Sequence, residues 1–304
     1  MFEILAKSGT DKLATVYIAK TQAGHYLEMV ESVQPPFTIE QKWVLIISTL
    51  SGCPINCLMC DAGGNYLGAL SKDEMFAEID YLISTKFRDK KILSKKFKIQ
   101  FARVGEPTLN LAVLDVLIEL PSRYQVPGLL PSLSTVAPIG SGKFLTKLVA
   151  IKNQYYSAGN FQLQFSIHTT DVALRDKIIP CNKWSFAEIA DYGDNFYRKG
   201  DKKIALNFAL AKEYPFDVSI MQKYFDPKIF LIKITPINPT LKASANNLTS
   251  YFTKGEAGED KNELIKSLKQ AGFEVILSIG ELEENLIGSN CGQYLKKLNG
   301  ECYV

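Results

Sequence analysis

Short apolar runs alternate along the chain with segments in which apolar residues recur every three or four positions. Runs rich in β-branched and aromatic residues predict buried strands. Segments in which apolar residues recur every three or four positions predict helices. Strands that alternate with helices are typical of repeated βα units around a mainly parallel sheet. The predicted strands are Trp43–Leu50, Phe97–Arg103, Leu129–Thr135, Phe161–His168, Ile204–Leu210, Phe230–Ile234 and Phe273–Leu277.

Six or seven such units with right-handed connections form an open or closed barrel, whose working loops lie at the carboxyl ends of the strands. We therefore predict an α/β fold in which residues 41–304 make a partial (βα)6-type barrel. Ser71 and Ser185 each stand three positions before a glutamate, the capping-box pattern of a helix start. The last predicted helix, over residues 259–271, ends before Gly272, as expected for a left-handed cap.

Two segments depart from this alternation. Leu13–Ala19 and His25–Val33 are short strand-like runs separated by a polar turn, so residues 1–40 predict a small N-terminal β-hairpin extension. Asn238–Gly258 is rich in small polar residues and has little periodicity. A stretch of this length inside a compact domain is usually a functional loop.

Composition and charge narrow the class of protein. Of the 304 residues 46% are hydrophobic and 22% are charged, which excludes disorder as the main state. The net charge of +3 excludes a strongly basic protein that coats nucleic acid. The most apolar run, Trp43–Leu50, is too short to cross a bilayer, which takes about 20 residues, and the first residues lack the pattern of a signal peptide. We expect a cytoplasmic protein with no membrane partner.

One local basic run lies between the first predicted barrel helix and the second strand. It is consistent with a patch for RNA phosphates. This connection is expected at the amino-terminal end of the barrel, opposite the working loops. That position favours a solvated surface over an RNA-binding patch. The run comprises Lys86, Arg88, Lys90, Lys91, Lys95, Lys96 and Lys98.

Three of the six cysteines, Cys53, Cys57 and Cys60, stand in one loop directly after the first barrel strand, which is unlike a disulfide framework. Three thiolates in a tight loop can bind a [4Fe–4S] cluster and leave the fourth iron open. An open iron can chelate S-adenosylmethionine (SAM) and deliver an electron to it. The alternatives are three buried thiols or a zinc site. A zinc site usually needs a second pair of ligands, and none is visible, because His25 and His168 are the only histidines.

The spacing of these cysteines resembles the radical-SAM superfamily, and further phrases resemble its RlmN/Cfr class, methyltransferases that act on adenine carbons of ribosomal RNA. The phrases are Ala14–Ile18, Val104–Asn110, Leu133–Thr135, Phe165–Thr169, Leu174–Asp176, Ile179–Pro180, Ile234–Pro239 and Asn290–Gln293. The resemblance implies a [4Fe–4S] cluster on the three loop cysteines. It also implies a SAM site made of Gly105, Glu106, Ser134, Ser166, Ile167, His168 and Asn238.

Cys291 is the residue that distinguishes methylation from other radical chemistry. In the family the matching cysteine accepts a methyl group from one SAM, and a radical from a second SAM activates that methyl for addition to an aromatic carbon. A thiolate is nucleophilic enough to attack a sulfonium, whereas an adenine carbon is not. The resemblance therefore implies that Cys291 is catalytic, the alternative being a small buried residue.

Two positions differ from the family pattern. The family has a second catalytic cysteine seven positions before the first cluster cysteine, where this chain has Ile46, and a glutamate where it has Ala14. Cys181 or Cys302 would replace that cysteine only if the fold brings one of them to the cluster. Residues 1–40 also leave no room for the family's N-terminal RNA-binding domain.

Three hypotheses for function follow. The first is methyl transfer through Cys291 to an sp2 carbon of RNA or of an adenine-like or small aromatic substrate. The second keeps the 5′-deoxyadenosyl radical but uses it for hydrogen abstraction from a small molecule or peptide, without methylation. The third is a catalytically degenerate RNA-binding homologue, against which the intact cysteine triad argues. Either enzyme would need an electron donor, for which we expect a flavodoxin- or ferredoxin-type protein.

Overall fold

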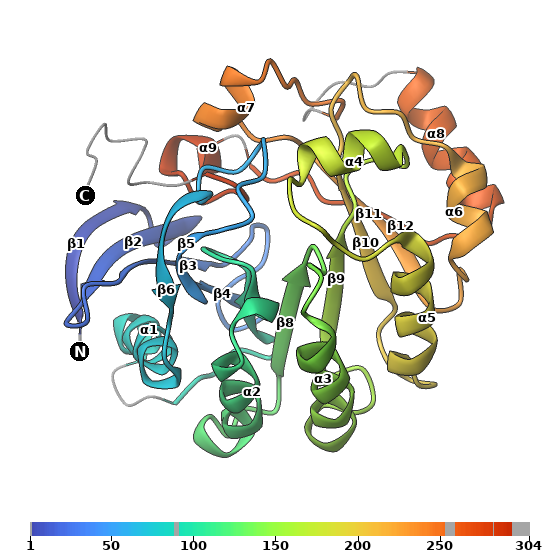
Figure 1. Ribbon diagram of the computed structural model, residues 1–304. Helices are drawn as coiled ribbons and strands as arrows, with labels where there is room; N and C mark the ends of the chain where they lie inside the picture. The colour runs from blue at the N-terminus through green and yellow to red at the C-terminus, as the bar shows by residue number, and fades with distance from the viewer. Residues whose placement is uncertain (1, 88–90, 253–258, 282, 294–304) are drawn as a thin grey trace.

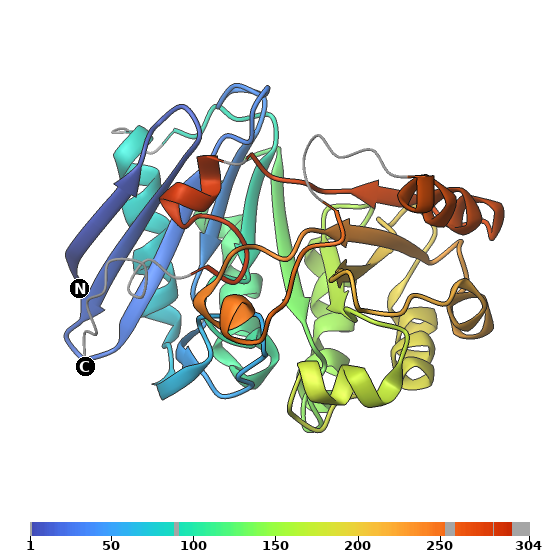
Figure 2. The same ribbon diagram turned by 90° about the horizontal axis from the view of Figure 1, so that it is seen from above.

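The computed structural model describes residues 2–87, 91–252, 259–281 and 283–293. Within these residues a ten-stranded sheet has the order β1-β2-β3-β4-β7-β8-β9-β10-β11-β12 and crosses the whole molecule (Figures 1 and 2). Its strands are β1 (Phe2–Gly9), β2 (Ala14–Thr21), β3 (Tyr26–Ser32), β4 (Trp43–Ile47), β7 (Phe97–Phe101), β8 (Leu129–Thr135), β9 (Gln162–Ser166), β10 (Ile204–Ala209), β11 (Phe230–Thr235) and β12 (Val275–Leu277).

The sheet is parallel from β4 to β12, and all seven strands predicted from the apolar runs belong to this part. The prediction of an α/β protein with a largely parallel sheet is thus confirmed. The sheet is open in the described part of the chain, since β1 and β12 are its two edges.

The N-terminal residues differ from the predicted hairpin in one respect. They form three strands, because β1 precedes the two that were expected, and β3 pairs antiparallel with β4. The extension therefore continues the main sheet. β1 is only partly buried along its length, with no fully apolar face, and this explains why its sequence gave a weak strand signal.

Helices follow most of the parallel strands. They are α1 (Lys72–Lys86), α2 (Ala112–Arg123), α3 (Gly142–Tyr155), α4 (Val172–Ile178), α5 (Phe186–Phe196), α6 (Val218–Tyr224), α7 (Leu241–Ala245), α8 (Glu259–Gln270) and α9 (Glu283–Ile287), with a 3-10 turn over Pro107–Leu109. Both predicted capping boxes are present, on Ser71 and on Ser185. Gly272 has φ +90°, in agreement with the predicted left-handed cap after α8.

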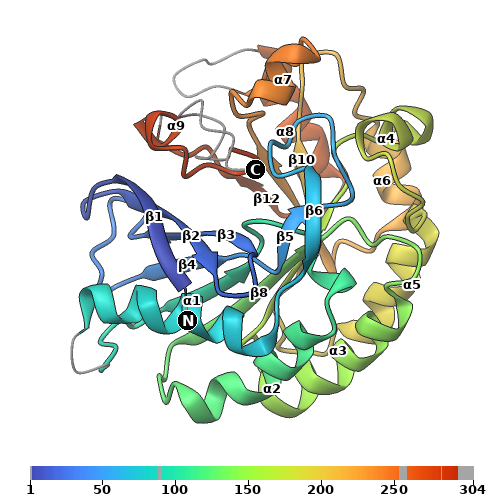
Figure 3. The same ribbon diagram turned by 60° about the vertical axis from the view of Figure 1, so that its left-hand side comes forward.

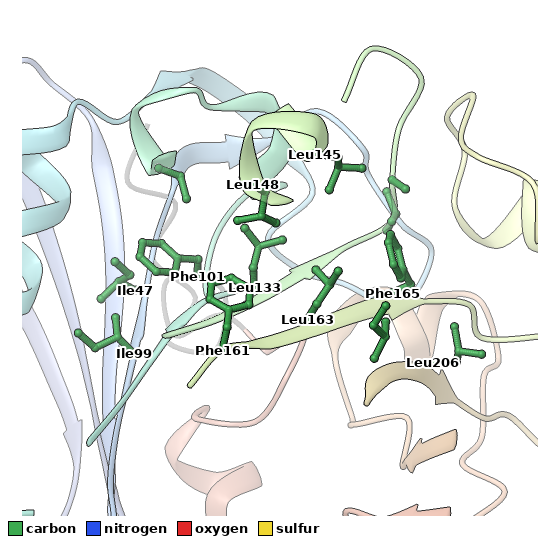
Figure 4. Close-up of a cluster of buried hydrophobic side chains, with 14 of the residues drawn as sticks. Ile47, Ile99, Phe101, Leu133, Leu145, Leu148, Phe161, Leu163, Phe165 and Leu206 are labelled. Atoms are coloured by element: carbon green, nitrogen blue, oxygen red, sulfur yellow. The ribbon is translucent and has the colours of Figure 1, made fainter. Parts of the chain in front are cut away.

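The main core lies between one face of the sheet and the helices outside it. Ile99, Phe101, Leu133, Leu163 and Phe165 alternate along their strands and pack together with Leu145 and Leu148 of α3 (Figure 4). Figure 3 shows α1, α2, α3 and α5 in an arc around this side of the sheet. Because side chains alternate along a strand, the intervening residues lie on the opposite face, which we call the inner face.

The inner face has an apolar part and a polar part. On β2, β3 and β4 it carries Ala14, Val16, Ile18, Val30 and Ile46, which pack with Ile287 of α9 as a small separate cluster. On β7 to β11 it is mostly polar, and its side chains are half-buried except for the buried Ser132 and Asn207. Residues of this second part are Lys98, Gln100, Ser132, Ser134, Gln162, Gln164, Ser166, Asn207, Lys233 and Thr235.

Among the described residues, no helix has both the length and the apolar character needed to cross a membrane.

Candidate functional site

The three clustered cysteines lie in a loop closed by a small hairpin. β4 is followed by β5 (Leu50–Cys53), which pairs antiparallel with β6 (Gly64–Ala69), and Cys53 and Gly64 are direct partners. The hairpin was not predicted, because β6 is largely exposed and has no apolar alternation. It places all three cysteines beyond the carboxyl end of β4, as the sequence predicts.

The three thiols lie in a buried environment. Burial raises the pKa of Cys53 and Cys57 and raises that of Cys60 to about 12, and the charges of neighbouring thiols raise the pKa of Cys57 and Cys60 further. Backbone N–H groups of Ile55 and Asn56 hydrogen-bond the sulfur of Cys53 and lower its pKa. All three cysteines are free of disulfides.

This donor set fits an iron–sulfur cluster better than a single ion. No three His, Cys, Asp or Glu side chains in the described residues are arranged to hold one metal ion. A cubane separates its cysteine sulfurs more widely than a single ion does, and amide donors to the sulfurs are typical of such clusters. The zinc alternative consequently has no ligand set among the residues described.

A second chain segment holds the cysteine loop in place. The Asp61 carboxylate accepts hydrogen bonds from the backbone N–H groups of Leu241 and Lys242 at the start of α7, at 2.9 and 3.0 Å. The Thr240 hydroxyl donates to the Met59 carbonyl at 2.9 Å, and the Lys242 ammonium donates to Asn56 Oδ1. The predicted functional loop after Asn238 thus lies against the cysteine loop, at the top of Figure 1.

Gly105 and Glu106 follow β7 and lie beside the same loop. Gly105 has φ +102°, and a Cβ there would come within 2.5 Å of Leu50, so only glycine permits this approach. The buried Glu106 carboxylate accepts hydrogen bonds from the hydroxyls of Thr108 and Thr135 at 2.7 and 2.6 Å and from the Val136 N–H at 2.9 Å. Burial raises its pKa. Among the described residues Oε2 accepts a hydrogen bond only from the Val136 N–H and keeps room for another donor.

His168 follows β9 in a strained conformation. Its φ is +69°, which is uncommon for a residue other than glycine and often marks a functional site. Nδ1 accepts a hydrogen bond from the Ala209 N–H at 3.0 Å, so the proton of the neutral ring is on Nε2. Burial, with the charge of Arg175, lowers the pKa of His168 to about 4. The ring is therefore a neutral donor at physiological pH.

This shift predicts that the protein loses stability on mild acidification. Below its ordinary pKa of 6.5 the unfolded chain protonates His168, whereas the folded ring stays neutral until about pH 4. We expect this residue to reduce the free energy of unfolding by about 2 kcal/mol between pH 7 and pH 5. Urea denaturation at the two pH values measures the loss. If the His168→Asn variant lost as much free energy of unfolding between pH 7 and pH 5 as wild-type protein, the loss would not come from His168.

The other predicted SAM residues lie at the same end of the sheet. Ser134 and Ser166 are half-buried on the inner face, and neither hydroxyl has a hydrogen-bond partner among the residues described. Ile167 is fully buried, and its N–H donates to the Asn207 carbonyl at 2.8 Å. Asn238 follows β11 and donates from Nδ2 to the Cys291 carbonyl at 2.8 Å. The fold thus brings together loops that follow four parallel strands.

Cys291 is exposed and lies next to the cysteine loop. The Asp61 N–H donates to the Gly292 carbonyl at 2.8 Å, and a Cβ on Gly292 would come within 3.1 Å of the Met59 carbonyl oxygen. The thiol of Cys291 is also close enough to Cys60 to raise its pKa. The buried alternative for Cys291 is wrong, because this residue is exposed.

Sequence reasoning missed the pair of residues that holds the Cys291 segment. The buried guanidinium of Arg103 donates from Nε to Glu28 on β3 at 2.8 Å, and Nη2 donates to the same carboxylate. It also donates to the carbonyls of Gly288, Ser289 and Asn290 at 2.6, 3.2 and 3.2 Å. Glu28 lies within β3 and Arg103 lies just after β7, far apart in the chain, so no local pattern signals the contact.

The positions that differ from the family pattern are together in space. Ile46 and Ala14 belong to the same apolar cluster on the inner face, which Ile287 of α9 covers. Cys181 lies near Cys57 and Glu106. The charge of Cys181 contributes to the raised pKa of Cys57, and the charge of Glu106 contributes to the raised pKa of Cys181. Cys302 lies outside the described residues.

Comparison with known proteins gives relatives of one kind. The dual-specificity RNA methyltransferase RlmN of Nautilia profundicola is 24% identical over 302 residues, covering 93% of this chain and 80% of that protein. A probable RlmN of Prochlorococcus marinus is 25% identical and covers 80% of this chain and 73% of the relative. A probable RlmN of Rhodococcus jostii is 26% identical and covers 78% of this chain and 64% of the relative. No family model matches the chain.

A solved structure supports the same assignment of the fold. The crystal structure of a radical SAM methyltransferase from Sphaerobacter thermophilus superposes with a TM-score of 0.70 over 96% of this chain and 80% of that one, at 15% identity. These matches confirm the predicted resemblance of the chain to the RlmN/Cfr-like radical-SAM methyltransferases, and they support the prediction of an enzyme that uses a [4Fe–4S] cluster and SAM, as the members of that class do.

Proposed function

We propose that this enzyme transfers a methyl group to an sp2 carbon through Cys291, acting on RNA or on an adenine-like or small aromatic substrate. The observation that carries the proposal is the place of Cys291, an exposed thiol fixed between Asn238 and the backbone around Cys60. An exposed thiol at that place would reach a SAM molecule bound over the cysteine loop. The similarity to the RlmN proteins, which are named as RNA methyltransferases, supports RNA as one substrate class.

The cofactors would be held by the two groups of residues described above. Cys53, Cys57 and Cys60 would hold the cluster, which when bound supplies the electron that cleaves SAM. SAM would lie at the carboxyl ends of the strands, the usual ligand site of a partial (βα)6-type barrel, which we propose for residues 41–304 with residues 1–40 as its extension. The SAM residues would be Gly105, Glu106, Ser134, Ser166, Ile167, His168 and Asn238.

Each group has a definite chemical task. The free side of Glu106 Oε2 would accept a hydrogen bond from the SAM ammonium, and the neutral His168 ring would donate from Nε2. The exposed Cys291 thiol would lose its proton to solvent, and the resulting thiolate would attack the SAM methyl group, so that the sulfonium–methyl bond breaks and S-adenosylhomocysteine leaves. The electron donor we propose is a flavodoxin- or ferredoxin-type protein of the cytoplasm.

The proposal is tested by the mass of the protein itself. Reconstituted enzyme incubated anaerobically with SAM is expected to carry one methyl group, and peptide mapping is expected to place it on Cys291. Cys291→Ala should carry none and should still cleave SAM. Absence of a methyl group from wild-type protein in every preparation would remove Cys291 as a carrier.

A second function, hydrogen abstraction without methylation, is favoured by one observation. The sites of the family's second cysteine and its glutamate are filled here by Ile46 and Ala14, packed in an apolar cluster with Ile287. The two functions differ in the Cys291→Ala variant. Hydrogen abstraction predicts that this variant still forms product together with 5′-deoxyadenosine, whereas the methyl relay predicts that product is lost.

A further inference from the structure

Asp61, the residue directly after the third clustered cysteine, joins three segments of the chain. It belongs to the cysteine loop, and its backbone N–H donates to the Gly292 carbonyl at 2.8 Å. Its carboxylate accepts hydrogen bonds from the N–H groups of Leu241 and Lys242, at 2.9 and 3.0 Å, at the start of α7. The segment of Cys291 and the start of α7 are therefore both joined to the cysteine loop through Asp61.

The three segments also pack closely where they meet. A Cβ on Gly292 would come within 3.1 Å of the Met59 carbonyl oxygen, 3.4 Å of Thr240 Cγ2 and 3.7 Å of Cys60 Cα. Gly292 has φ +81°, a conformation that favours glycine. The Thr240 hydroxyl donates to the Met59 carbonyl at 2.9 Å. The position of Gly292 is thus set by contacts with both of the other segments.

The backbone of Cys291 is also held from the side of α7. Asn238 donates from Nδ2 to the Cys291 carbonyl at 2.8 Å, and the Thr240 N–H donates to the Asn238 carbonyl at 2.8 Å. Thr240 is the N-cap of α7, and its hydroxyl accepts a hydrogen bond from the Ala243 N–H at 2.8 Å. A displacement of the start of α7 would therefore reach the Cys291 carbonyl through Asn238.

A buried carboxylate is costly at this position unless its hydrogen bonds are strong. Asp61 is only 1% exposed, and each of its two carboxylate oxygens accepts a hydrogen bond from one of the two N–H groups of α7. Hydrogen bonds to a charged acceptor are roughly twice as strong as those between neutral groups. An amide has a single oxygen and a hydroxyl is shorter, so neither group would replace both hydrogen bonds.

We propose that Asp61 is a positioning residue of the methyl-transfer site: its carboxylate holds α7 and Asn238 against the cysteine loop, and thereby sets the place of Cys291 relative to the three clustered cysteines. This proposal rests on the proposed function, in which Cys291 carries the methyl group. Asp61 acts through Asn238 and Gly292 and not by contact with the reacting atoms. It lies outside the phrases that carry the family resemblance, so its role comes from these contacts alone.

Two variants break the contact between Asp61 and α7 from its two ends. Asp61→Ala removes both acceptor oxygens, and Leu241→Pro removes one of the two N–H donors. Leu241 is exposed and is the first residue of α7, a position at which proline fits a helix. Thr240 before it is extended, with φ −86° and ψ 160°, as residues before proline usually are. Leu241→Ala keeps the N–H and is the matched control.

Hydrogen exchange of the reconstituted full chain measures this contact without any catalytic step. Residues 238–246 and 284–293 should exchange about tenfold faster in Leu241→Pro and faster still in Asp61→Ala, while Leu241→Ala should match wild-type protein. The double variant Asp61→Ala/Leu241→Pro should exchange no faster than Asp61→Ala, because both replacements break the same contact. Unchanged exchange in Asp61→Ala, or effects that multiply in the double variant, would overturn the proposal.

Methylation of Cys291 separates a positioning role from a contribution to folding alone. At saturating SAM, Asp61→Ala should methylate Cys291 at least about tenfold more slowly than wild-type protein, because a small misplacement of a reacting group slows a reaction strongly. Iron content and the formation of 5′-deoxyadenosine should stay near the wild-type values. A parallel loss of all three would show that Asp61 only supports the fold, and would overturn the proposal.

The two kinds of measurement also distinguish this proposal from the proposed function. If wild-type protein never methylates Cys291 while the exchange results are as expected, the proposed function is refuted and the contact through Asp61 is supported. If wild-type protein methylates Cys291 and Asp61→Ala does so at the same rate, the role of Asp61 is refuted and the proposed function is supported.

Discussion

Replacing Arg103 with Met is expected to lower the free energy of unfolding by about 3–5 kcal/mol, because it removes the guanidinium that is paired with the fully buried Glu28. The replacement also removes three hydrogen bonds to the backbone carbonyls of residues 288–290. Urea denaturation followed by circular dichroism measures the loss. The double variant Glu28→Met/Arg103→Met should recover most of it, since no isolated charge remains.

The same variant tests whether this ion pair matters to the site. Without Arg103 the segment before Cys291 loses its anchor to β3 and β7, so hydrogen exchange of residues 284–293 should become faster than in wild-type protein. Methylation of Cys291 should decrease, while cleavage of SAM continues. The double variant is the matched control, because it restores stability without restoring the anchor. Normal Cys291 methylation in that control would show that Arg103 only stabilises the fold.

The parallel sheet was predictable because its strands are buried by helices on one face and leave clear apolar runs. Trp43–Ile47 and Phe97–Phe101 are of this kind, and helix starts such as Ser71 carry their capping signal within four residues. The β5–β6 hairpin left no such signal. Gly64–Ala69 is exposed, and its pairing with β5 depends on the glycine turns around the cysteine loop rather than on apolar alternation.

The candidate site was predictable in its residue types but not in its supports. Cys53, Glu106 and His168 stand in recognisable phrases after predicted strands, and the fold gathers the ends of those strands. The contact of Arg103 with Glu28 joins positions 75 residues apart, and periodicity holds no information about such a pair. Lys98, which lies on the inner face, was mistaken for part of a solvated surface because a sequence does not say which face of β7 is open.

Replacing Cys57 with Ala is expected to abolish the cluster and all cleavage of SAM, whereas Cys181→Ala should retain both. The two variants make the same replacement, and the charge of Cys181 contributes to the raised pKa of Cys57, so the control residue lies on the same side of the protein as the triad. Only Cys57 belongs to the triad. A cubane with one open iron needs three cysteine ligands, so the loss of one of them should prevent assembly of the cluster.

The measurement is the iron and sulfide content of anaerobically reconstituted protein, together with 5′-deoxyadenosine formed in the presence of a reductant. Wild-type protein and Cys181→Ala should contain about four iron and four sulfide ions each, and Cys57→Ala should contain far less and form no 5′-deoxyadenosine. Equal melting temperatures of the two variants would show that the difference arises at the cluster and not in folding. Loss of the cluster in Cys181→Ala instead would move the third ligand from Cys57 to its neighbour and would refute the triad.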